Sequence, residues 1–273
     1  MANTNLVALK GYFDNESVKS NLRAMLGTKA QGFATSVLSV VNNNKLLQNA
    51  DPKTIYSSAM VAASLDLPIN PNLGFAAIVP YGGSAQFQIM TRGLVQLAIR
   101  SGQYAKITNC DVHEGELVKY DPFTDDFVFD ATKKTSDKIV GYMSYFRTIG
   151  GFEKYLYMTK EEALAHGKKY SKTFSKGVWA TDPDAMGRKT VLKLLLSRYG
   201  ILSIEMQRAI KFDQGVVKDD FTQIDNVEDL DNADVEYVDN PDENEVDEKK
   251  AKAVAEKFAG FGDTSDKPST ESK

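Results

Sequence analysis

Apolar residues recur at helical spacing through the first seventy positions of the chain. Residues 17–26 and 33–41 each place several valine, leucine, methionine or phenylalanine side chains on one side of a helix. Asp51 and Pro52 mark a strong helix start, because a carboxylate caps the first turn and proline fits the first helical position. We expect this third helix to end near Leu65. Its inward residues are predicted to be Ile55, Ala59, Ala62 and Ala63.

The pattern changes after the proline-bounded loop at residues 68–74, where alternation with a period of two indicates strands. Predicted strands cover residues 75–81, 85–90, 104–112, 139–148 and 152–158. Gly82-Gly83 and Gly150-Gly151 are two-residue hairpin signals between neighbouring strands. Between the second and third strands, Thr91 is expected to cap a short helix that stops at Gly102.

Two later segments begin with helix signals. Residues 159–162 have the sequence of a capping box, and Asp182 with Pro183 repeats the cap-then-proline signal for a helix that runs to about Tyr199. The lysine-rich residues 168–177 between them are expected to form a loop. Leading helices, a central antiparallel sheet and late helices together predict an α+β fold.

Charge divides the chain near residue 215. Residues 216–273 hold 18 acidic and 7 basic side chains, a net charge of −11, and residues 1–215 hold the other 19 acidic and 26 basic side chains, a net of +7. A basic body favours a polyanion as its partner. Residues 219–248 have too few apolar side chains to offset chain entropy, so we expect them to be mostly disordered.

This division predicts a folded body at residues 1–215 and a flexible acidic tail at 216–273. Within the tail, residues 247–261 carry alanine, valine and phenylalanine at helical spacing. That segment either docks on a partner or competes with DNA for the basic body; the alternative is that the tail only adds solubility.

The residues required for a disulfide, a closed zinc site, an ATP-binding loop or a Ser/His/Asp catalytic set are absent from the sequence. A single cysteine, Cys110, excludes an internal disulfide, and with His113 and His166 it does not complete a closed zinc site. There is no phosphate-binding loop of the G-x-x-x-x-G-K-[ST] type and no assignable Ser/His/Asp set. The Glu-x-Lys pairing of many nucleases occurs only at residues 248–250 and 271–273. We expect a protein that is not an enzyme and requires no cofactor, leave the role of Mg²⁺ open, and keep a metal-dependent DNA-processing nuclease as the alternative.

No apolar run approaches the roughly 18 residues of a membrane span, and the first residues show no signal-peptide pattern. We therefore expect a soluble protein of the reduced cytoplasm that has no membrane partner.

Basic residues of the body are interleaved with tyrosine and phenylalanine, a combination that neutralises phosphates and stacks on bases. They gather around the short helix at 91–102, on the strand at 139–148, in residues 168–177 and on the helix at 183–199. The candidate DNA-binding residues are Arg92, Arg100, Tyr104, Lys106, Arg147, Lys168, Lys169, Lys172, Lys176, Arg188, Lys189, Lys193 and Arg198. A single surface lysine is usually only solvated, and aromatic strands more often belong to a core, so the interpretation depends on the groups together.

The helix at 183–199 gives the sharpest of these interpretations. Leucines cover one broad side, and Lys189 and Lys193 gather with two hydroxyl side chains on the other, as a strip that fits a phosphate backbone. Arg188 and Arg198 fall near or inside the apolar arc, so ion pairs or a subunit boundary are alternatives for them. Trp179, just before the helix, is expected to be a packing anchor.

Several short segments, in the expected order, resemble the RecT family. They are AASLDLPINP (62–71), VPYG (79–82), QFQI (86–89) with Arg92-Gly93, RSG (100–102), WATD (179–182) and MGRKT (186–190). The similarity covers about residues 55–203, and it is strongest to RecT-type proteins of phages and prophages of Gram-positive bacteria. No family motif is found from residue 216 onward.

The resemblance implies a recombinase that anneals single-stranded DNA without ATP and holds the duplex intermediate in a basic groove. It further implies rings or helical filaments of identical chains, with a phage 5′→3′ exonuclease and a host single-strand-binding protein as partners in the bacterial cytoplasm. We assign the subunit interface mainly to the N-terminal helices. A protein that only coats single strands, and so inhibits their pairing, is a third hypothesis.

The resemblance also implies a β-β-β-α core like that of other single-strand annealing proteins. Its helix corresponds either to residues 184–199 or to residues 92–100, and the sequence leaves this choice open.

Overall fold

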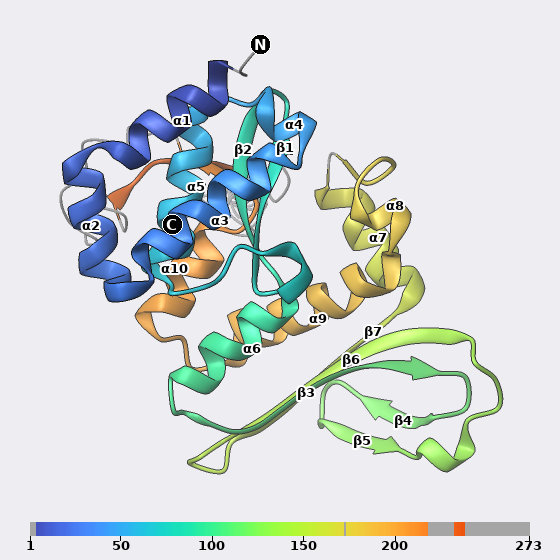
Figure 1. The fold of residues 1–273 in the computed structure, drawn as a ribbon. Coiled ribbons are helices and arrows are strands. Elements are labelled where there is room, and N and C mark those ends of the chain that lie inside the picture. The colour runs from blue at the N-terminus through green and yellow to red at the C-terminus, as the bar shows by residue number, and fades with distance from the viewer. Residues whose placement is uncertain (1–3, 172, 218–231, 238–273) are drawn as a thin grey trace, which may run out of the picture. The chain divides into compact units, whose positions relative to one another are not determined.

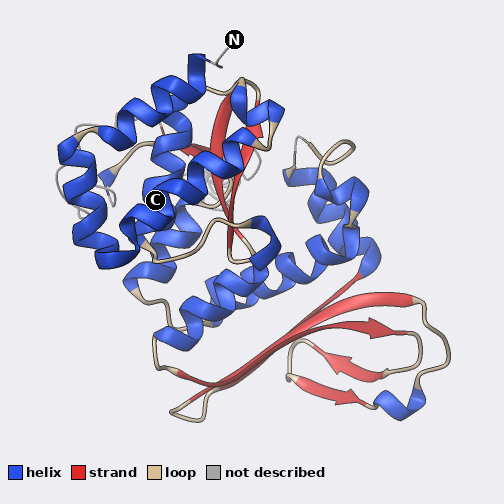
Figure 2. Ribbon diagram, viewed as in Figure 1, coloured by secondary structure: helices blue, strands red, loops and turns tan. Residues whose placement is uncertain are grey.

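The computed structural model describes residues 4–171, 173–217 and 232–237. The chain divides into two units, Met1–Asp239 and Asn240–Lys273, and every described residue belongs to the first. Figures 1 and 2 show helices around a hairpin in one part of this unit and a curved sheet in the other. The predicted α+β fold, with leading helices and antiparallel sheets, is confirmed.

The leading helices surround one central helix. Their bounds are α1 (Thr4–Asp14), α2 (Glu16–Leu26), α3 (Ala30–Asn42), α4 (Lys45–Gln48) and α5 (Pro52–Ser64). The predicted start of α5 is confirmed, since the Asp51 carboxylate accepts a hydrogen bond from the backbone N–H of Lys53 at 2.9 Å and Pro52 follows it. All residues of α5 from Ile55 to Ala63 are buried, because α1, α2 and the neighbouring hairpin pack around it.

That hairpin consists of β1 (Ala76–Tyr81) and β2 (Ser84–Ile89), as predicted. Gly82 and Gly83 both have positive φ, 51° and 88°, which the tight turn between Tyr81 and Ser84 requires. A short 3-10 turn, η2 (Pro71–Leu73), precedes β1.

The hairpin continues into β8 (Gly215–Val217) and β9 (Val235–Tyr237), giving the strand order β1-β2-β8-β9. The predicted boundary after Gly215 therefore falls inside β8, where Val216 and Val217 are buried. Val216 and Val217 stay in the fold because their side chains are buried and because β8 pairs with β2 and β9. The division of charge along the sequence indicates neither the burial nor the pairing. The expected helix at 247–261 lies outside the described residues.

A second sheet has the order β3-β6-β7, with both neighbouring pairs antiparallel. Its strands are β3 (Tyr104–His113), β6 (Ile139–Thr148) and β7 (Glu153–Thr159), close to the predicted ranges. A separate hairpin of β4 (Leu117–Asp121) and β5 (Asp126–Phe129), followed by η3 (Ala131–Lys133), was not predicted. The hairpin packs on β7 through aromatic rings, with the Phe127 and Tyr155 centroids 5.0 Å apart.

Five helices complete the unit: α6 (Thr91–Arg100), α7 (Lys160–Tyr170), α8 (Val178–Thr181), α9 (Pro183–Tyr199) and α10 (Ile204–Phe212). Helix α9 packs across all three strands of the second sheet, as Figure 1 shows. Four of the predicted apolar residues of α9 are fully buried: Val191, Leu192, Leu195 and Leu196. Thr91 is the first residue of α6 and not its cap, since Met90 holds that position without a side-chain bond.

Candidate nucleic-acid interface

A cluster of exposed lysines lies where α7 ends. Lys168 and Lys169 occupy the last turn of α7, and Lys176 lies in the segment that leads to α8; all three are exposed. The expectation of a loop is therefore wrong for the first two, because the capping box of Thr159 and Glu162 starts a helix that continues through them. We call these three residues the α7 lysine cluster. Lys172 lies outside the described residues.

The α7 lysine cluster is held in place by Trp179. The indole packs so closely against Gly167 that a Cβ there would lie 2.6 Å from it. Trp179 is only 7% exposed, and the Phe174 ring lies 5.8 Å from it between centroids. The predicted role of Trp179 as a packing anchor is confirmed, and this anchor fixes the end of α7 against α8.

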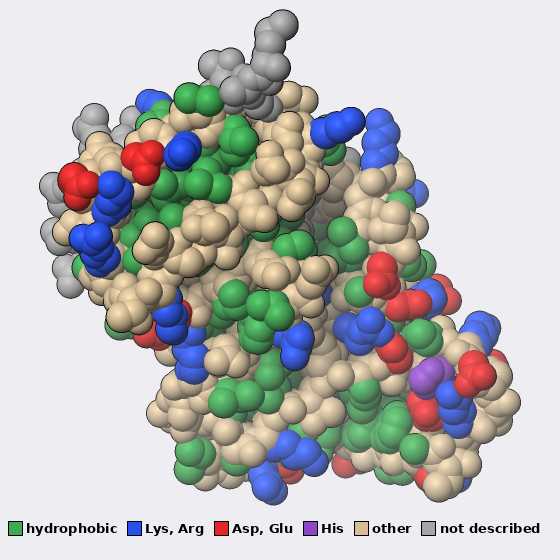
Figure 3. Space-filling view, in the orientation of Figure 1, with side chains coloured by type: hydrophobic (Ala, Val, Ile, Leu, Met, Phe, Trp, Pro, Cys, Tyr) green, Lys and Arg blue, Asp and Glu red, His purple; other side chains and the backbone are tan. Residues whose placement is uncertain are grey.

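Acidic side chains are missing from this part of the chain. No aspartate or glutamate occurs between residues 163 and 181, and in the described residues none of the three lysines has an ion pair. Lys169 instead contacts the Tyr170 side chain, with Nζ 2.7 Å from the hydroxyl oxygen and 4.6 Å from the ring centroid. Figure 3 shows Lys and Arg side chains gathered beside α7 and α8. These charges are available to an external anion, and they also suit the negative end of the helix dipole.

The two lysines of α9 behave in the opposite way. Lys189 is buried and lies 3.2 Å from the Asp213 carboxylate, and Lys193 lies 2.8 Å from the other oxygen of the same group. Asp213 is completely buried; burial alone would raise its pKa, but the two ammonium groups outweigh this and hold the pKa below its ordinary value. The open strip predicted on α9 is therefore wrong, because Asp213 and the chain after α10 cover it.

Two further candidates, Arg188 and Tyr104, make contacts inside the fold. Arg188 donates to Asp111 at 2.6 Å, which agrees with the ion-pair alternative. Burial raises the pKa of the Tyr104 hydroxyl, which donates to the Ile201 carbonyl at 2.9 Å while its ring packs edge-on against Phe146.

Arg92 and Arg100 are exposed, but their guanidinium groups fasten the chain between α5 and β1. Arg92 donates to the Leu73 carbonyl at 3.0 Å and lies over the Phe75 ring. Arg100 donates through two nitrogens to the Leu65 carbonyl, both at 2.9 Å. Arg198 is also exposed, near the end of α9.

The face of the second sheet that points away from α9 carries the last pair of candidates. Lys106 and Arg147 are register partners on β3 and β6, and both are exposed. Lys106 lies over the Tyr145 ring, which stacks on Tyr155 of β7 with centroids 4.6 Å apart. The opposite face buries Tyr142 and Phe146 against α9 and the core. The aromatic residues of β6 are thus buried in the core on one face of the sheet and half-exposed on the other. The sequence alone did not show which rings lie on which face.

Tyr145 is tied to an acidic neighbour on this face. Its hydroxyl donates to the Glu153 carboxylate at 2.7 Å, and this hydrogen bond, with some burial, raises the pKa of Tyr145 to about 12. Glu153 is also the register partner of Arg147. The cations on this face are therefore less free than the α7 lysine cluster.

Two further findings concern metal binding and membrane-spanning helices. Among the described residues, no group of three or more His, Cys, Asp or Glu side chains is placed to hold a metal ion. In the same part of the chain, no helix has the length and apolar character that crossing a membrane requires.

Comparisons with known proteins identify the family to which this chain belongs. Residues 31–232, well over half of the chain, match the model of the RecT family. The chain is 46% identical over 229 residues to the uncharacterized protein YqaK of Bacillus subtilis, which covers 83% of this chain and 78% of that protein. It is 25% identical over 240 residues to Protein RecT of Escherichia coli, covering 80% and 88% of the two chains.

These matches place the chain among proteins that bind DNA and anneal single strands in recombination. It belongs to the RecT family.

Proposed function

We propose that this protein pairs complementary single strands of DNA without ATP, and that the α7 lysine cluster is its main phosphate contact. Membership of the RecT family supports the reaction, and the exposed lysines without acidic partners support the site. Contacts to phosphate are independent of sequence and leave base edges free, as annealing of any two complementary strands requires.

Lys106 and Arg147 are the second proposed contact. They flank the half-exposed rings of Tyr145 and Tyr155, so a strand that crosses this face meets cations and aromatic edges together. Arg92, Arg100 and Arg198 stay candidates because their side chains are exposed. Lys189, Lys193 and Arg188 are not proposed as contacts, since their charges are compensated by Asp213 and Asp111.

Annealing is tested with two complementary oligonucleotides that carry a donor and an acceptor dye. We expect the full chain to pair them several times faster than the protein-free rate with no nucleotide present. A variant with Lys168→Ala, Lys169→Ala and Lys176→Ala should lose most of this acceleration, whereas Lys133→Ala, on exposed η3, should keep it. Pairing at the protein-free rate, or slower pairing of protected strands, would reject annealing; slower pairing would favour simple coating.

The same samples test the nuclease alternative. End-labelled DNA incubated with Mg²⁺ or Mn²⁺ should stay intact if annealing is the activity. A ladder of shortened products would instead support a DNA-processing enzyme, and addition of EDTA to the pairing assay reports whether Mg²⁺ matters.

We also propose that the protein acts as a homo-oligomer in the bacterial cytoplasm, with a 5′→3′ exonuclease and a single-strand-binding protein as partners. The net charge of −11 over residues 216–273 makes this segment the proposed contact for those partners. Replacing the acidic residues at 242–248 by their amides should weaken capture of either partner and leave annealing of bare strands unchanged.

A further inference from the structure

Along one edge of β1, backbone groups lack partners among the described residues. β1 stands at the end of the strand order β1-β2-β8-β9, so one of its edges pairs with β2 and the other edge is free in this part of the chain. In a strand, the N–H and C=O of one residue point to one edge and those of the next residue to the other. The Phe75 carbonyl accepts a hydrogen bond from the Met90 N–H at 3.0 Å, so the odd-numbered residues face β2. The backbone groups of Ala76, Ile78 and Pro80 therefore point to the free edge.

Pro80 agrees with this geometry, because proline has no N–H and occurs in sheets mainly on edge strands. Ile78 does have an N–H, and within the described residues this group makes no hydrogen bond. The residue is only 5% exposed. Roughly 90% or more of buried backbone N–H groups in proteins are hydrogen-bonded. The unpaired donor of Ile78 therefore indicates a partner that supplies a carbonyl at this edge.

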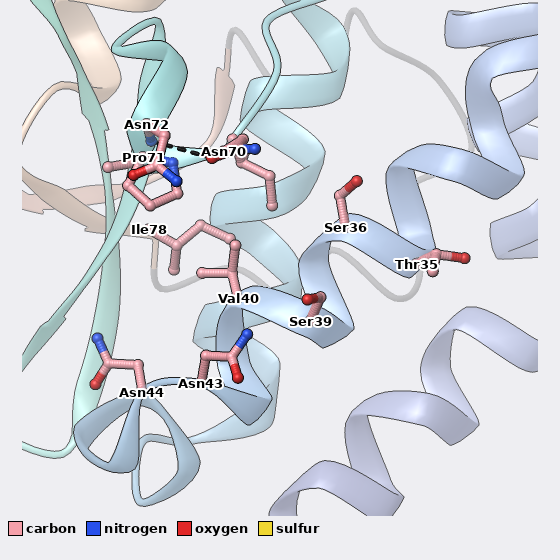
Figure 4. Close-up of a pocket in the computed structure, with 12 residues that line it drawn as sticks. Thr35, Ser36, Ser39, Val40, Asn43, Asn44, Asn70, Pro71, Asn72 and Ile78 are labelled. Carbon is pink, nitrogen blue, oxygen red and sulfur yellow. Dashed lines mark hydrogen bonds between the residues drawn. The ribbon is translucent and has the colours of Figure 1, made fainter.

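An uncharged pocket lies along the free edge, between α3, η2 and β1. Its volume is about 660 Å³, and none of its twelve lining residues is charged. Ala77 and Ile78 line it together, and no residue of β2 does. Because neighbouring side chains of a strand point to opposite faces, a pocket that touches both residues adjoins the edge of β1 that lies away from β2. Figure 4 shows Val40 and Ile78 at its centre, with asparagine and serine side chains around them.

The polar side chains of the uncharged pocket offer both acceptors and donors. Ser36 donates its hydroxyl proton to the Gly32 carbonyl at 2.9 Å, so its lone pairs remain as acceptors. Oδ1 of Asn70 accepts the backbone N–H of Asn72 at 3.0 Å, which leaves the Asn70 amide N–H groups as donors. These groups suit the polar side chains of an uncharged segment, and the apolar centre suits its apolar ones.

We infer that the free edge of β1 binds an extended, uncharged segment of another protein as an added strand. Such a segment supplies a carbonyl to the Ile78 N–H and an N–H to the Ile78 carbonyl, as neighbouring strands do, and its apolar side chains cover Val40. The outward groups run from Ala76 to Pro80, so the segment is about five residues long. This inference does not rest on the annealing proposal.

Charge and topology separate this occupant from others. DNA finds no cation in the uncharged pocket, whereas phosphates need cations such as those of the α7 lysine cluster. A charged peptide would lose hydration there without gaining a counter-charge. Every described strand of this chain already belongs to a sheet, so a second copy would have to give up one of its own strands to fill the edge. A segment of another protein carries no such cost.

The probe is a capped, dye-labelled peptide with the sequence SAQFQI, copied from residues 84–89. This is the sequence of β2, which pairs with the other edge of β1, is uncharged and alternates polar with apolar side chains. Fluorescence anisotropy measures its binding to the full chain. Methyl groups on the backbone nitrogens of the serine and both glutamines block the N–H groups of one peptide edge, and methyl groups on those of the other three residues block the opposite edge. One of these sets should weaken binding at least tenfold more than the other.

Two arginine variants on α3 locate the binding site. Ser39→Arg places a long cation in the uncharged pocket from an exposed helical position that arginine tolerates, and it should weaken peptide binding at least tenfold. Gln31→Arg, exposed on the same helix outside the pocket, is the matched control and should bind like the parent. In the parent, saturating peptide should slow hydrogen exchange of the Ile78 N–H at least tenfold. The Val79 N–H, which faces β2, should not change.

Four results would overturn the inference. The first is absence of peptide binding, or equal weakening by the two methylated sets, since contact through side chains alone treats both edges alike. The second is an Ile78 N–H that exchanges as slowly as that of Val79 without peptide, which would show that a segment of the same chain covers the edge. The third is a Ser39→Arg variant that binds peptide like Gln31→Arg but sediments differently, which would assign the pocket to a second copy. The fourth is a Ser39→Arg variant altered only in affinity for single-stranded DNA, which would assign the pocket to nucleic acid.

Discussion

The lysines at the end of α7 and the lysines of α9 have the same chemistry but opposite environments. Lys168 and Lys169 extend into solvent with no acidic side chain between residues 163 and 181. Lys189 and Lys193 converge on Asp213, which lies 24 and 20 residues later in the chain. A helical projection identifies the side of α9 that carries its lysines, but it does not reveal which distant segment covers that side. Charge on a helix therefore indicates an interface only where the later chain leaves it uncovered.

Asp213 does more than neutralise the two lysines. Its Oδ1 also accepts the backbone N–H of Ile89 at 3.0 Å, so one carboxylate joins the end of β2, helix α9 and the connection from α10 to β8. Two ammonium groups, buried Lys189 and partly buried Lys193, depend on this one acid. The difference between the two lysine groups is thus measurable as stability in one case and as DNA affinity in the other.

The largest expected effect follows from Asp213→Asn. Asparagine keeps an oxygen for the Ile89 N–H but removes the charge, which leaves Lys189 buried without a counter-ion. Removing one partner of a buried ion pair costs about 3–5 kcal/mol of unfolding free energy. Urea denaturation followed by circular dichroism measures this, and adding Lys189→Met should restore part of the loss. A loss below about 1 kcal/mol would mean that the α9 lysines are solvated like those of α7.

Gly167→Ala has the next largest expected effect, and it addresses the support of the α7 lysine cluster. The new methyl group would meet the indole of Trp179, and overpacking of this kind costs about 1–3 kcal/mol. Trp179 is the only tryptophan of the chain, so its fluorescence reports the displacement directly. DNA affinity should fall although no charge is removed. Gly11→Ala in α1, where nothing lies within 4 Å, is the control and should change neither signal.

Removing the α7 lysine cluster should scarcely alter stability, because exposed substitutions usually stay within about 0.5 kcal/mol. Its effect is on binding. Salt weakens binding to single-stranded DNA, so a plot of log association constant against log salt concentration has a negative slope. With Lys168, Lys169 and Lys176 all changed to alanine, this slope should become less negative by about 2, because each lost phosphate contact removes about 0.7. Fluorescence anisotropy at several salt concentrations measures the slope. An unchanged slope would move the phosphate contact away from α7.

The sequence predicted best the elements that local chemistry fixes. The Asp51-Pro52 start, the capping box at Thr159 and the turn at Gly82-Gly83 all formed where expected, because each depends on neighbouring residues. The candidate site was predicted less well. Whether an arginine or lysine is exposed depends on partners far along the chain, such as Asp213 for Lys189 and Asp111 for Arg188.

Short elements were missed for the same reason. The β4–β5 hairpin is stabilised by rings of β7, and β8 by its pairing with β2 and β9, so neither carries a strong local signal. The uncharged pocket between α3, η2 and β1 likewise draws its lining from elements that only the fold brings together, as Figure 4 shows.

The smallest expected effect concerns Lys106 and Arg147, which lie between the two extremes because they are exposed but have Glu153 close by. Glu153→Gln removes the charged acceptor of Tyr145, so the pKa of Tyr145 should fall from about 12 toward its ordinary value of 10. In the parent, the raised value favours the folded protein below pH 10, and this contribution is lost between pH 10 and about 12. Phenolate absorbance or the NMR shift of the tyrosine ring carbon measures the titration.

The same substitution leaves Arg147 without its acidic neighbour, so DNA should bind slightly more tightly at low salt. If the titration moves and the affinity does not, the cations of this face lie outside the DNA path, and the α7 lysine cluster holds the phosphates without them.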